Sequence, residues 1–245
     1  MSPVFSIITI TYNAERWIER TLRSVEEQTY PEIEYLIIDG ASTDETMPLI
    51  HGHEGRITSW TSEPDKGIYD AMNKGLRQAT GDYVWFLNAG DEFAMPDTLR
   101  LVAETIQHSK DWPDILYGET DITNENGEVK GRRRLKAPEH LDWQSFRHGM
   151  LVCHQSFIVR KDLAPAFDLR YRYSSDFDWC IRCLQKANGI LNTHLTLSRF
   201  LDGGTSSQQR KVSLFERYRI MCHYYGRTST TLRHLWFALR FFFLK

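Results

Sequence analysis

Polar side chains follow three apolar stretches of this sequence, each at the point where the stretch ends. They are Tyr12 and Asn13 after "IITIT", Asp39 at the end of "YLIID", and Asn88, Gly90 and Asp91 after "YVWFL". In open α/β sheets, ligands bind outside the carboxyl ends of the strands. If these stretches are neighbouring strands, their ends predict one shared polar site. For "NAGD" alone, a tight turn built from ordinary turn residues is the alternative.

Asp91 is the candidate metal ligand in this group. Mg²⁺ and Mn²⁺ are held in many proteins by one or two carboxylates, with phosphates and water completing the coordination. Asn88 and Glu92 lie close enough in sequence to assist Asp91. Gly90 lets a backbone approach a ligand closely.

Strands and helices alternate over the first 118 residues. The stretches 4–11, 34–39 and 83–87 are rich in apolar and β-branched residues and predict buried strands. Helical spacing of apolar residues predicts helices after each of them, and Ser42 and Glu45 have the spacing of a capping box. This order predicts βαβ units and a mostly parallel sheet.

The second half is less regular. Residues 119–150 are polar and charged, which predicts a loop-rich insertion. We expect a strand in "CHQSFIVR", a helix over 178–187 that stops at Asn188-Gly189, and a strand in "ILNTHLTLSRF". Two helices, at about 211–225 and 228–244, are expected to close the chain.

The composition excludes several classes of protein. The 245 residues are 41% hydrophobic and 25% charged, with a net charge of −2, which suits a globular domain without a global attraction for nucleic acid. Four cysteines are too few for a disulfide scaffold. No signal peptide is evident and no apolar run approaches the roughly 20 residues that span a bilayer, so a cytosolic location is the default.

Several motifs in order give this sequence a family resemblance. "SIITITYNAERWIERTLRSVEEQTYPEIEYLIIDGASTDET" and "SEPDKGIYDAMNKGLRQATGDYVWFLNAGDEF" resemble the family 2 glycosyltransferases with the GT-A fold. The resemblance is dense over residues 4–118 and resumes at "CHQSFIVR", "SSDFDWCIRC" and "GGTSS". It implies a Rossmann-like, mostly parallel sheet flanked by helices. The catalytic domain would span residues 1–205, and residues 206–245 would form a C-terminal helical segment that can associate with a membrane.

The resemblance also implies a reaction. Such an enzyme transfers a sugar, with inversion, from a nucleotide-sugar that is usually a UDP-sugar. The acceptor is a saccharide or lipid-linked saccharide in bacterial surface polysaccharide or lipopolysaccharide synthesis. The implied cofactor is Mn²⁺ or Mg²⁺. The implied place of action is the cytoplasm, at the inner face of the cell membrane.

Site residues carry over by motif. The nucleotide-sugar group comprises Thr11, Tyr12, Asn13, Asp39, Asp65, Lys66, Asn88 and Gly90. Asp91 would assist the metal, although "NAGD" stands where the family has Asp-x-Asp. Asp176 in "SSDFDW" would be the catalytic base, because inverting transfer needs a carboxylate to take the acceptor proton. His154, Gln155 and Asp178 would contact the donor or acceptor sugar.

Each of these later roles has an alternative. Asp176 opens a predicted helix and can simply be its N-cap, and His154-Gln155 can be a polar strand end. Gly203 to Ser206 would close over the diphosphate in similar proteins, but a lone Gly-Gly is weak evidence. Cys180 and Cys183 are best interpreted as buried core residues.

Two sequence features bear on partners. The basic run "KGRRRLK" (130–136) predicts either a solvated loop or a segment that attracts anionic lipid headgroups or a pyrophosphate-linked acceptor. The aromatic and basic C-terminus "RHLWFALRFFFLK" favours a membrane interface, and the alternative is a helix docked on the catalytic domain or on a dimer partner. For the whole protein, the alternatives are a non-catalytic binder of the same fold and a nucleotidyltransferase. The latter would normally need a glycine-rich phosphate loop near the N-terminus, which "SIITITYNAERW" lacks.

Overall fold

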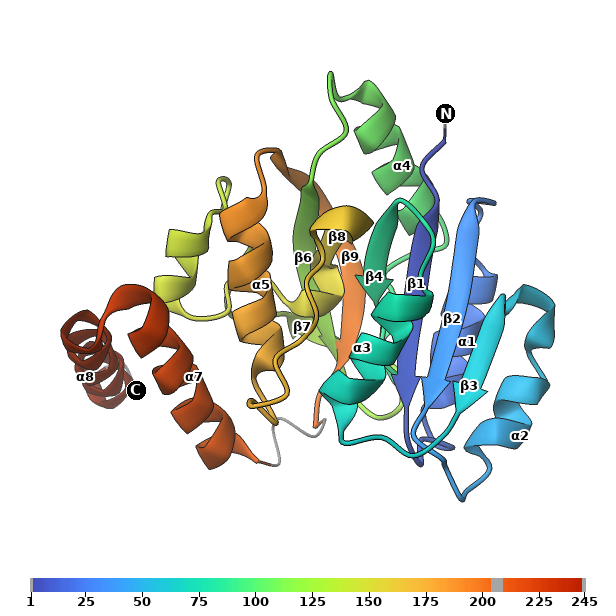
Figure 1. The fold of residues 1–245 in the computed structure, drawn as a ribbon, viewed down its shortest axis with the longest axis horizontal. Coiled ribbons are helices and arrows are strands. Elements are labelled where there is room, and N and C mark those ends of the chain that lie inside the picture. The colour runs from blue at the N-terminus through green and yellow to red at the C-terminus, as the bar shows by residue number, and fades with distance from the viewer. Residues whose placement is uncertain (1, 204–208, 244–245) are drawn as a thin grey trace.

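A computed structural model describes residues 2–203 and 209–243, with side chains as far as residue 235. In the described residues, nine strands form one sheet in the order β3-β2-β1-β4-β8-β6-β9-β5, with β7 paired to β6 (Figure 1). Helices cover both faces of this sheet. The predicted α/β fold, with a central sheet flanked by helices, is confirmed.

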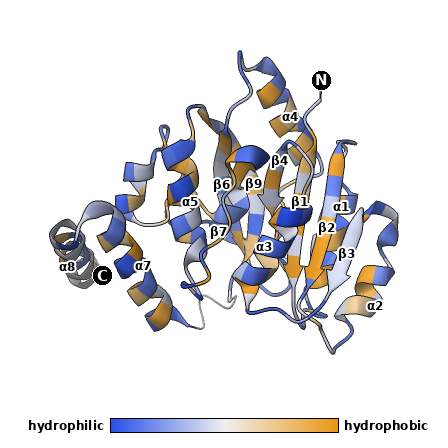
Figure 2. Ribbon diagram, in the orientation of Figure 1, coloured by the Kyte–Doolittle hydropathy of each residue, from blue (hydrophilic) through white to orange (hydrophobic). Residues whose placement is uncertain are grey.

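The N-terminal half of the sheet is parallel. Its strands are β1 (Phe5–Thr11), β2 (Ile33–Asp39), β3 (Ser59–Ser62) and β4 (Tyr83–Phe86). Strands β1 and β2 are coloured largely as hydrophobic in Figure 2 because both of their faces are covered. All four strands therefore end at one edge of the sheet. The short strand β3 was missed in the sequence because it is mostly exposed and polar.

Alternate residues of β1 face two separate cores. Phe5 and Ile7 pack with α1 and α4 on one face, and Ile8 and Ile10 pack with α3 and α5 on the other. The helices are α1 (Ile18–Glu26), α2 (Thr46–His51), α3 (Ile68–Gln78), α4 (Thr98–His108) and α5 (Ser175–Lys186). Short 3₁₀ helices span Glu54–Arg56, Trp143–His148, His154–Ser156 and Lys161–Leu163.

The other half of the sheet mixes strand directions. Its strands are β5 (Glu92–Phe93), β6 (Ile115–Thr123), β7 (Val129–Arg132), β8 (Phe157–Arg160) and β9 (Ile190–Leu201). The expectation of a loop-rich insertion over 119–150 is wrong in its first part, because β6 runs on to Thr123 and β7 pairs with it. Backbone hydrogen bonds form these ladders without an apolar pattern, so the polar sequence concealed them.

The predicted capping box at Ser42 and Glu45 is also wrong. Helix α2 begins at Thr46, and the Ser42 hydroxyl instead donates to the Asp39 carboxylate at 2.5 Å. Serine competes for nearby acceptors in this way, since its hydroxyl serves a turn as well as a helix.

Helices α7 (Arg210–Tyr225) and α8 (Arg227–Phe243) close the chain. Helix α7 packs on the core beside α5 through Ile220, Met221 and Tyr225, and the Tyr225 ring stacks on Trp143 at 5.7 Å. Among the described residues, no helix is both long enough and apolar enough to cross a membrane. The division of the chain at residue 205 stays a prediction.

Candidate active site

Asp39 organises the end of strand β2. Its carboxylate is 1% exposed and accepts hydrogen bonds from the Ser42 amide at 2.9 Å and the Ser62 hydroxyl at 2.6 Å, besides the Ser42 hydroxyl. A carboxylate offers about four acceptor positions, so these three bonds leave room for one more. Asp39 therefore fixes the loop after β2 and can still accept from a ligand.

Tyr12 and Asp65 meet at Gly40, directly after Asp39. A Cβ atom on Gly40 would lie 2.6 Å from Asp65 Oδ2 and 3.2 Å from Tyr12 Cδ2, so a side chain at this position would displace the Asp65 carboxylate. The Tyr12 ring is 63% exposed, which leaves its face open for a flat ligand. The geometry thus brings together three of the residues that the resemblance assigned to the nucleotide.

The other residues of the predicted nucleotide group lie nearby. Asn13 adopts a positive φ of 47°, and its side-chain oxygen accepts from the Thr43 amide at 2.9 Å. Lys66 is exposed in the loop before α3. Thr11 ends β1, and its hydroxyl oxygen is buried without a hydrogen-bond partner. An unpaired buried hydroxyl at a strand end is a position where a ligand can complete the hydrogen bonding.

Asp176 lies in the first turn of α5, and its side chain is 14% exposed. The Tyr69 hydroxyl, from the first turn of α3, donates to its Oδ1 at 2.9 Å. His154 Nδ1 is 3.6 Å from its Oδ2, too far for a normal hydrogen bond. Ser174 is the N-cap residue of α5, so the alternative role of Asp176 as the cap is wrong. Its Oδ2 remains available for a substrate.

His154 connects Asp176 to the end of strand β4. The Asn88 amide nitrogen lies 3.4 Å from His154 Nε2. Burial lowers the pKa of His154, with Asp176 opposing and Arg133 adding to the shift. A neutral imidazole whose Nε2 accepts from Asn88 carries its proton on Nδ1, which faces Asp176. Asn88 Oδ1 is itself buried without a hydrogen-bond partner.

Asp91 is buried and already engaged. It is 3% exposed, and its two carboxylate oxygens accept from the Gln155 side-chain amide at 2.8 Å and from the Leu201 backbone amide at 3.1 Å. Burial raises its pKa to about 7 against these hydrogen bonds, which lower it. Gly90, at φ 99°, packs against Leu201 where a Cβ would come within 2.7 Å. Asp91 therefore ties the end of β9 to the loop after β4.

The surroundings of the Asp91 carboxylate do not fit a divalent ion bound to it. Asp91 is 3% exposed and each of its oxygens already accepts one N–H, so only the remaining lone pairs of this enclosed carboxylate could meet an ion. The described part of the chain contains no group of three or more His, Cys, Asp or Glu side chains that can hold a metal. The assignment of Asp91 to Mn²⁺ or Mg²⁺ stays a prediction that this geometry does not support.

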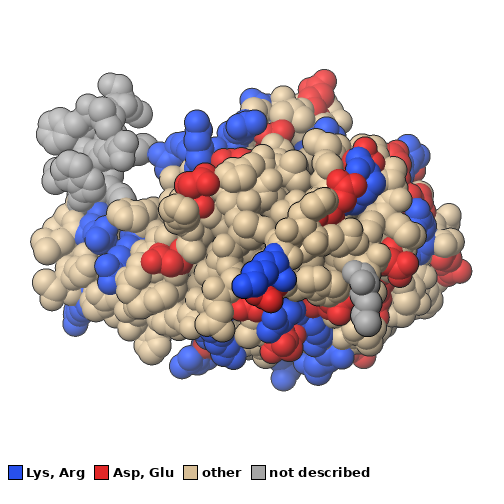
Figure 3. Space-filling view, turned by 90° about the horizontal axis from the view of Figure 1, so that it is seen from above, with Lys and Arg blue, Asp and Glu red and all other residues tan. Residues whose placement is uncertain are grey.

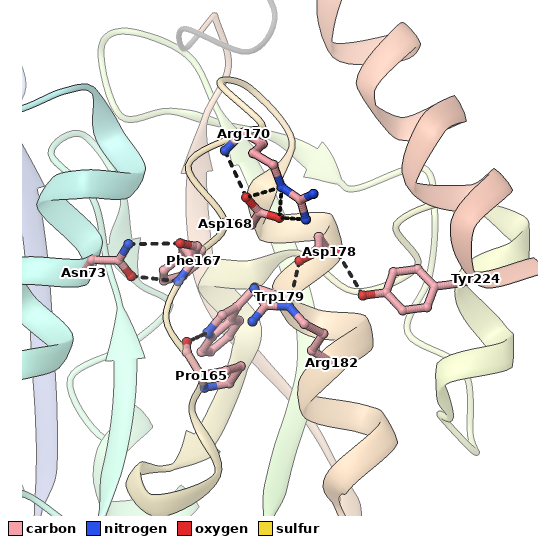
Figure 4. Close-up of polar contacts among 9 residues, drawn as sticks. All are labelled: Asn73, Pro165, Phe167, Asp168, Arg170, Asp178, Trp179, Arg182 and Tyr224. Carbon is pink, nitrogen blue, oxygen red and sulfur yellow. Dashed lines mark hydrogen bonds and ion pairs between the residues drawn. The ribbon is translucent and has the colours of Figure 1, made fainter.

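Gln155 and Asp178 are not brought to the Asp176 carboxylate. The Gln155 side chain donates to Asp91, accepts from the Cys153 thiol at 2.7 Å, and is 1% exposed. Asp178 accepts from Arg182 at 2.7 Å and from Tyr224 at 2.8 Å, on the side of α5 that faces α7 (Figure 4). In the described structure both side chains form hydrogen bonds within the protein, and their predicted contact with a sugar stays untested.

Sequence reasoning missed Tyr69 and the support around it. The Tyr69 ring stacks on Phe167 at 5.6 Å, and Asn73 clamps the Phe167 backbone with hydrogen bonds of 3.0 and 2.7 Å (Figure 4). Phe167 also stacks on Trp179 of α5 at 4.9 Å. Helix α3 is thereby locked to the helix that carries Asp176. The available signal was a tyrosine on a buried helix face, whose hydroxyl needs a partner.

Arg217 of α7 was also missed. Its Nε is buried without a hydrogen-bond partner, and its charge is one of the influences on Tyr69. The pKa of Tyr69 is nevertheless raised well above its ordinary value, chiefly by burial and then by the charge of Asp176. Tyr69 therefore stays a protonated donor. Of the predicted glycine-rich segment, only Gly203 belongs to the described residues, and residues 204–206 lie outside them.

Comparison with known proteins identifies related sequences. The family model described as Glycosyl transferase family 2 matches residues 6–164. A PGL/p-HBAD biosynthesis glycosyltransferase of Mycobacterium bovis is 34% identical over 189 residues, which cover 74% of this chain and 70% of that protein. An amylovoran biosynthesis glycosyltransferase of Erwinia amylovora is 30% identical over 190 residues, 73% of this chain and 63% of that protein.

Solved structures share the fold. Residues 1–349 of Staphylococcus aureus TarS, in complex with UDP-GlcNAc, superpose with a TM-score of 0.71 at 23% identity, covering 89% of this chain. This chain spans only 64% of that TarS chain. A mannosyltransferase of Pyrobaculum calidifontis, in complex with GDP-Man and Mn²⁺, gives a TM-score of 0.62 at 16% identity, covering 95% of this chain and 74% of that one.

Proposed function

This chain belongs to glycosyltransferase family 2 and is a transferase, and from that premise we propose that it moves a sugar, with inversion, from a UDP-sugar to a saccharide or lipid-linked saccharide. The relatives named for PGL/p-HBAD and amylovoran synthesis support a product of the bacterial cell surface. The TarS complex with UDP-GlcNAc supports a uridine nucleotide.

The environment of Asp176 carries this proposal. Tyr69 holds one oxygen of the carboxylate, and the other faces a buried His154 without a short bond. A fixed, partly exposed carboxylate with one open oxygen suits a general base. In the reaction, this oxygen takes the proton of the acceptor hydroxyl. The acceptor oxygen then bonds to the anomeric carbon while the bond from that carbon to the diphosphate breaks.

The strand ends of β1 and β2 supply the nucleotide site in this proposal. The exposed Tyr12 ring offers a stacking surface for the base, and Asp39 offers a remaining acceptor for a base N–H or ribose hydroxyl. The Asp65 side chain and the Tyr12 ring both lie against Gly40, the residue after Asp39. Asp65 lies just before α3, and Tyr69 lies in the first turn of that helix, so the nucleotide group and the surroundings of Asp176 are also connected along the chain.

Charge on the departing diphosphate must be balanced. The P. calidifontis relative contains Mn²⁺, and GT-A enzymes of this family commonly use a divalent metal. Because the surroundings of Asp91 do not fit such an ion, we assign no step to it. Arg217, with its buried unpaired Nε, is a cationic side chain near the proposed base and can face an anion.

The test is Asp176→Asn, assayed for UDP release and sugar transfer with a panel of UDP-, GDP- and dTDP-sugars, with and without Mn²⁺. We expect transfer to fall by roughly 10³-fold, within the range of general base catalysis, while the thermal shift produced by UDP is retained. Asp111→Asn, at an exposed aspartate, is the matched control. Full transfer by the Asp176 variant, or no nucleotide-sugar turnover by the wild type, would overturn the proposal.

A further inference from the structure

The C-terminal helices carry a charge opposite to that of the rest of the chain. Residues 209–245 contain eight Lys and Arg and one acidic residue, Glu216, for a net charge of +7. Since the whole chain has 30 Lys and Arg and 32 Asp and Glu, residues 1–208 carry 22 and 31, a net charge of −9. Such asymmetry indicates a local partner of negative charge, although the protein as a whole is nearly neutral.

The single acid does not offset these cations at the surface. Glu216 is 8% exposed, and its oxygens accept from the backbone amides of Arg172 at 2.8 Å and Tyr173 at 2.9 Å. Lys211, Phe215 and Arg219 follow one another at intervals of four, so they share the outer side of α7, and all three are exposed. In the view of Figure 3, Lys and Arg (blue) predominate at the left end, whereas blue and red side chains are mixed at the right end.

Apolar side chains are exposed among the cations. Of the eleven large hydrophobic side chains that are exposed in the described residues, five belong to these two helices. They are Val212, Leu214, Phe215, Leu232 and Leu235, with exposed fractions of 44–63%. Figure 2 shows the resulting alternation of orange and blue along α7. We name these five residues, with Arg210, Lys211, Arg219 and Arg227, the α7–α8 surface.

The two helices form one unit. The Tyr218 hydroxyl of α7 and the Thr231 hydroxyl of α8 are 2.8 Å apart, and the Tyr218 ring meets His234 edge to face at 5.2 Å. Helix α7 in turn is fixed to the segment before Asp176. The hydroxyls of Ser213 and Ser174 are 2.9 Å apart. Close by in the same segment, the backbone amides of Arg172 and Tyr173 donate hydrogen bonds to Glu216. Whatever binds the α7–α8 surface is therefore held near the proposed base.

We propose that the α7–α8 surface docks the protein on an anionic lipid bilayer and so presents Asp176 to an acceptor at the membrane. Exposed Leu and Phe side chains enter the boundary of a bilayer while Lys and Arg meet lipid phosphates, and this pairing fits both features of the surface. A nucleic acid would use the cations and leave the aliphatic side chains in water. A second copy would bring two surfaces of like charge together. The link to the acceptor rests on the proposed function, whereas the docking does not.

The experiment is flotation of the full chain with vesicles of phosphatidylcholine alone and with 30% phosphatidylglycerol. We expect binding only to the anionic vesicles, and weaker binding as NaCl rises from 0.1 to 0.5 M. Lys211→Gln with Arg219→Gln removes two exposed cations and should weaken partitioning by roughly 25-fold, at about fivefold for each charge. Leu214→Ser with Phe215→Ser tests the apolar contribution and should abolish flotation. Arg77→Gln with Lys110→Gln is the matched control, because both side chains are exposed elsewhere.

Every outcome decides the matter. Wild-type protein that does not float with anionic vesicles, or α7 variants that float as well as the control, would overturn the proposal. Vesicle-independent dimerisation that the Phe215 variant loses would assign the surface to a second copy, and binding to duplex DNA in place of vesicles would assign it to nucleic acid. Asp176→Asn must float like the wild type, and the α7 variants must keep turnover with a soluble acceptor. Failure of docking is thereby separated from failure of the reaction.

Discussion

Asp91 and Asp176 are linked through neighbouring residues of one short segment, Gln155 and His154, yet their carboxylates are held in different ways. Asp91 is 3% exposed, and N–H donors from Gln155 and Leu201 occupy both of its oxygens. Asp176 has a side chain that is 14% exposed, with one oxygen bonded to Tyr69 and the other without a short bond.

The difference separates a carboxylate that holds the fold from one that can meet a substrate. A general base needs an oxygen that a hydroxyl proton can reach. A structural carboxylate needs donors for all its oxygens, because an unsatisfied buried acceptor costs about 1–3 kcal/mol. What decides between these two roles is whether the protein leaves one oxygen of the carboxylate without a hydrogen bond. The predictions below test that distinction from its largest expected effect to its smallest.

The stability of the protein should depend on the titration of Asp91. Its folded-state pKa is raised from the ordinary 3.8 to about 7 by burial, so the folded protein binds this proton more tightly than the unfolded chain does. The stabilisation is therefore complete at pH values below the ordinary pKa and is lost as pH rises towards 7. Urea unfolding should show roughly 3 kcal/mol of this loss between pH 5 and 8, at about 1.4 kcal/mol per pH unit.

Asp91→Asn removes this titration and provides the reference. We expect the free energy of unfolding of the variant to depend less on pH over the same window, with or without Mn²⁺. Identical pH dependence in both proteins would contradict a protonated, structural Asp91. A variant that is as stable as the wild type but has lost Mn²⁺-dependent turnover would restore Asp91 as a metal ligand.

The fold and the strand-end residues were largely predictable, for a physical reason. Parallel strands covered on both faces must be apolar, and their polar ends meet at one edge, so Tyr12, Asp39 and Asn88 follow from pattern alone. Which carboxylate oxygens of Asp91 and Asp176 accept hydrogen bonds from the protein was not predictable. The donors of Asp91 lie 64 and 110 residues away along the chain, and the donor of Asp176 lies 107 away. Only tertiary packing sets such contacts.

Helical geometry bears on one assignment that stays untested, the contact of Asp178 with a sugar. Asp178 follows Asp176 by two residues in a helix, and successive residues turn by about 100°, so the two carboxylates point to nearly opposite sides. Asp178 accordingly meets Arg182 and Tyr224 near α7. Helical geometry alone could have separated the pair once Asp176 was assigned to the substrate side.

Asp178→Ala should therefore destabilise the protein without harming the chemistry. The change leaves Arg182, whose side chain is 27% exposed, and the Tyr224 hydroxyl without their shared acceptor. Because Arg182 is partly solvated, we expect a loss of about 2 kcal/mol rather than the 3–5 kcal/mol of a fully buried pair. Urea unfolding measures the loss, and turnover per folded molecule should stay within about twofold of the wild type, since no reacting group is removed. A stable variant with little transfer would place Asp178 at the sugar.

The smallest effect concerns the bond that orients the proposed base. Tyr69→Phe keeps the ring stacked on Phe167 and deletes only the hydroxyl that donates to Asp176. A hydrogen bond to a charged group contributes about 1.5–3 kcal/mol, and part of this is recovered when water replaces the hydroxyl. We expect kcat to fall by about tenfold with KM nearly unchanged, because a positioning contact to the base acts on the chemical step.

A double variant distinguishes this role from a general loosening of the site. If Tyr69 acts only through Asp176, then adding Tyr69→Phe to Asp176→Asn should cost little further activity, because the group being oriented is already gone. Tyr35→Phe is the matched control, since Tyr35 is another buried tyrosine, whose hydroxyl lies 3.1 Å from the Thr9 hydroxyl inside the core. Independent, multiplicative losses in the double variant would mean that Tyr69 contacts the substrate itself. Tyr69 and Asp176 would then both belong to the groups that contact the acceptor, and Tyr69 could no longer be described as only orienting the carboxylate.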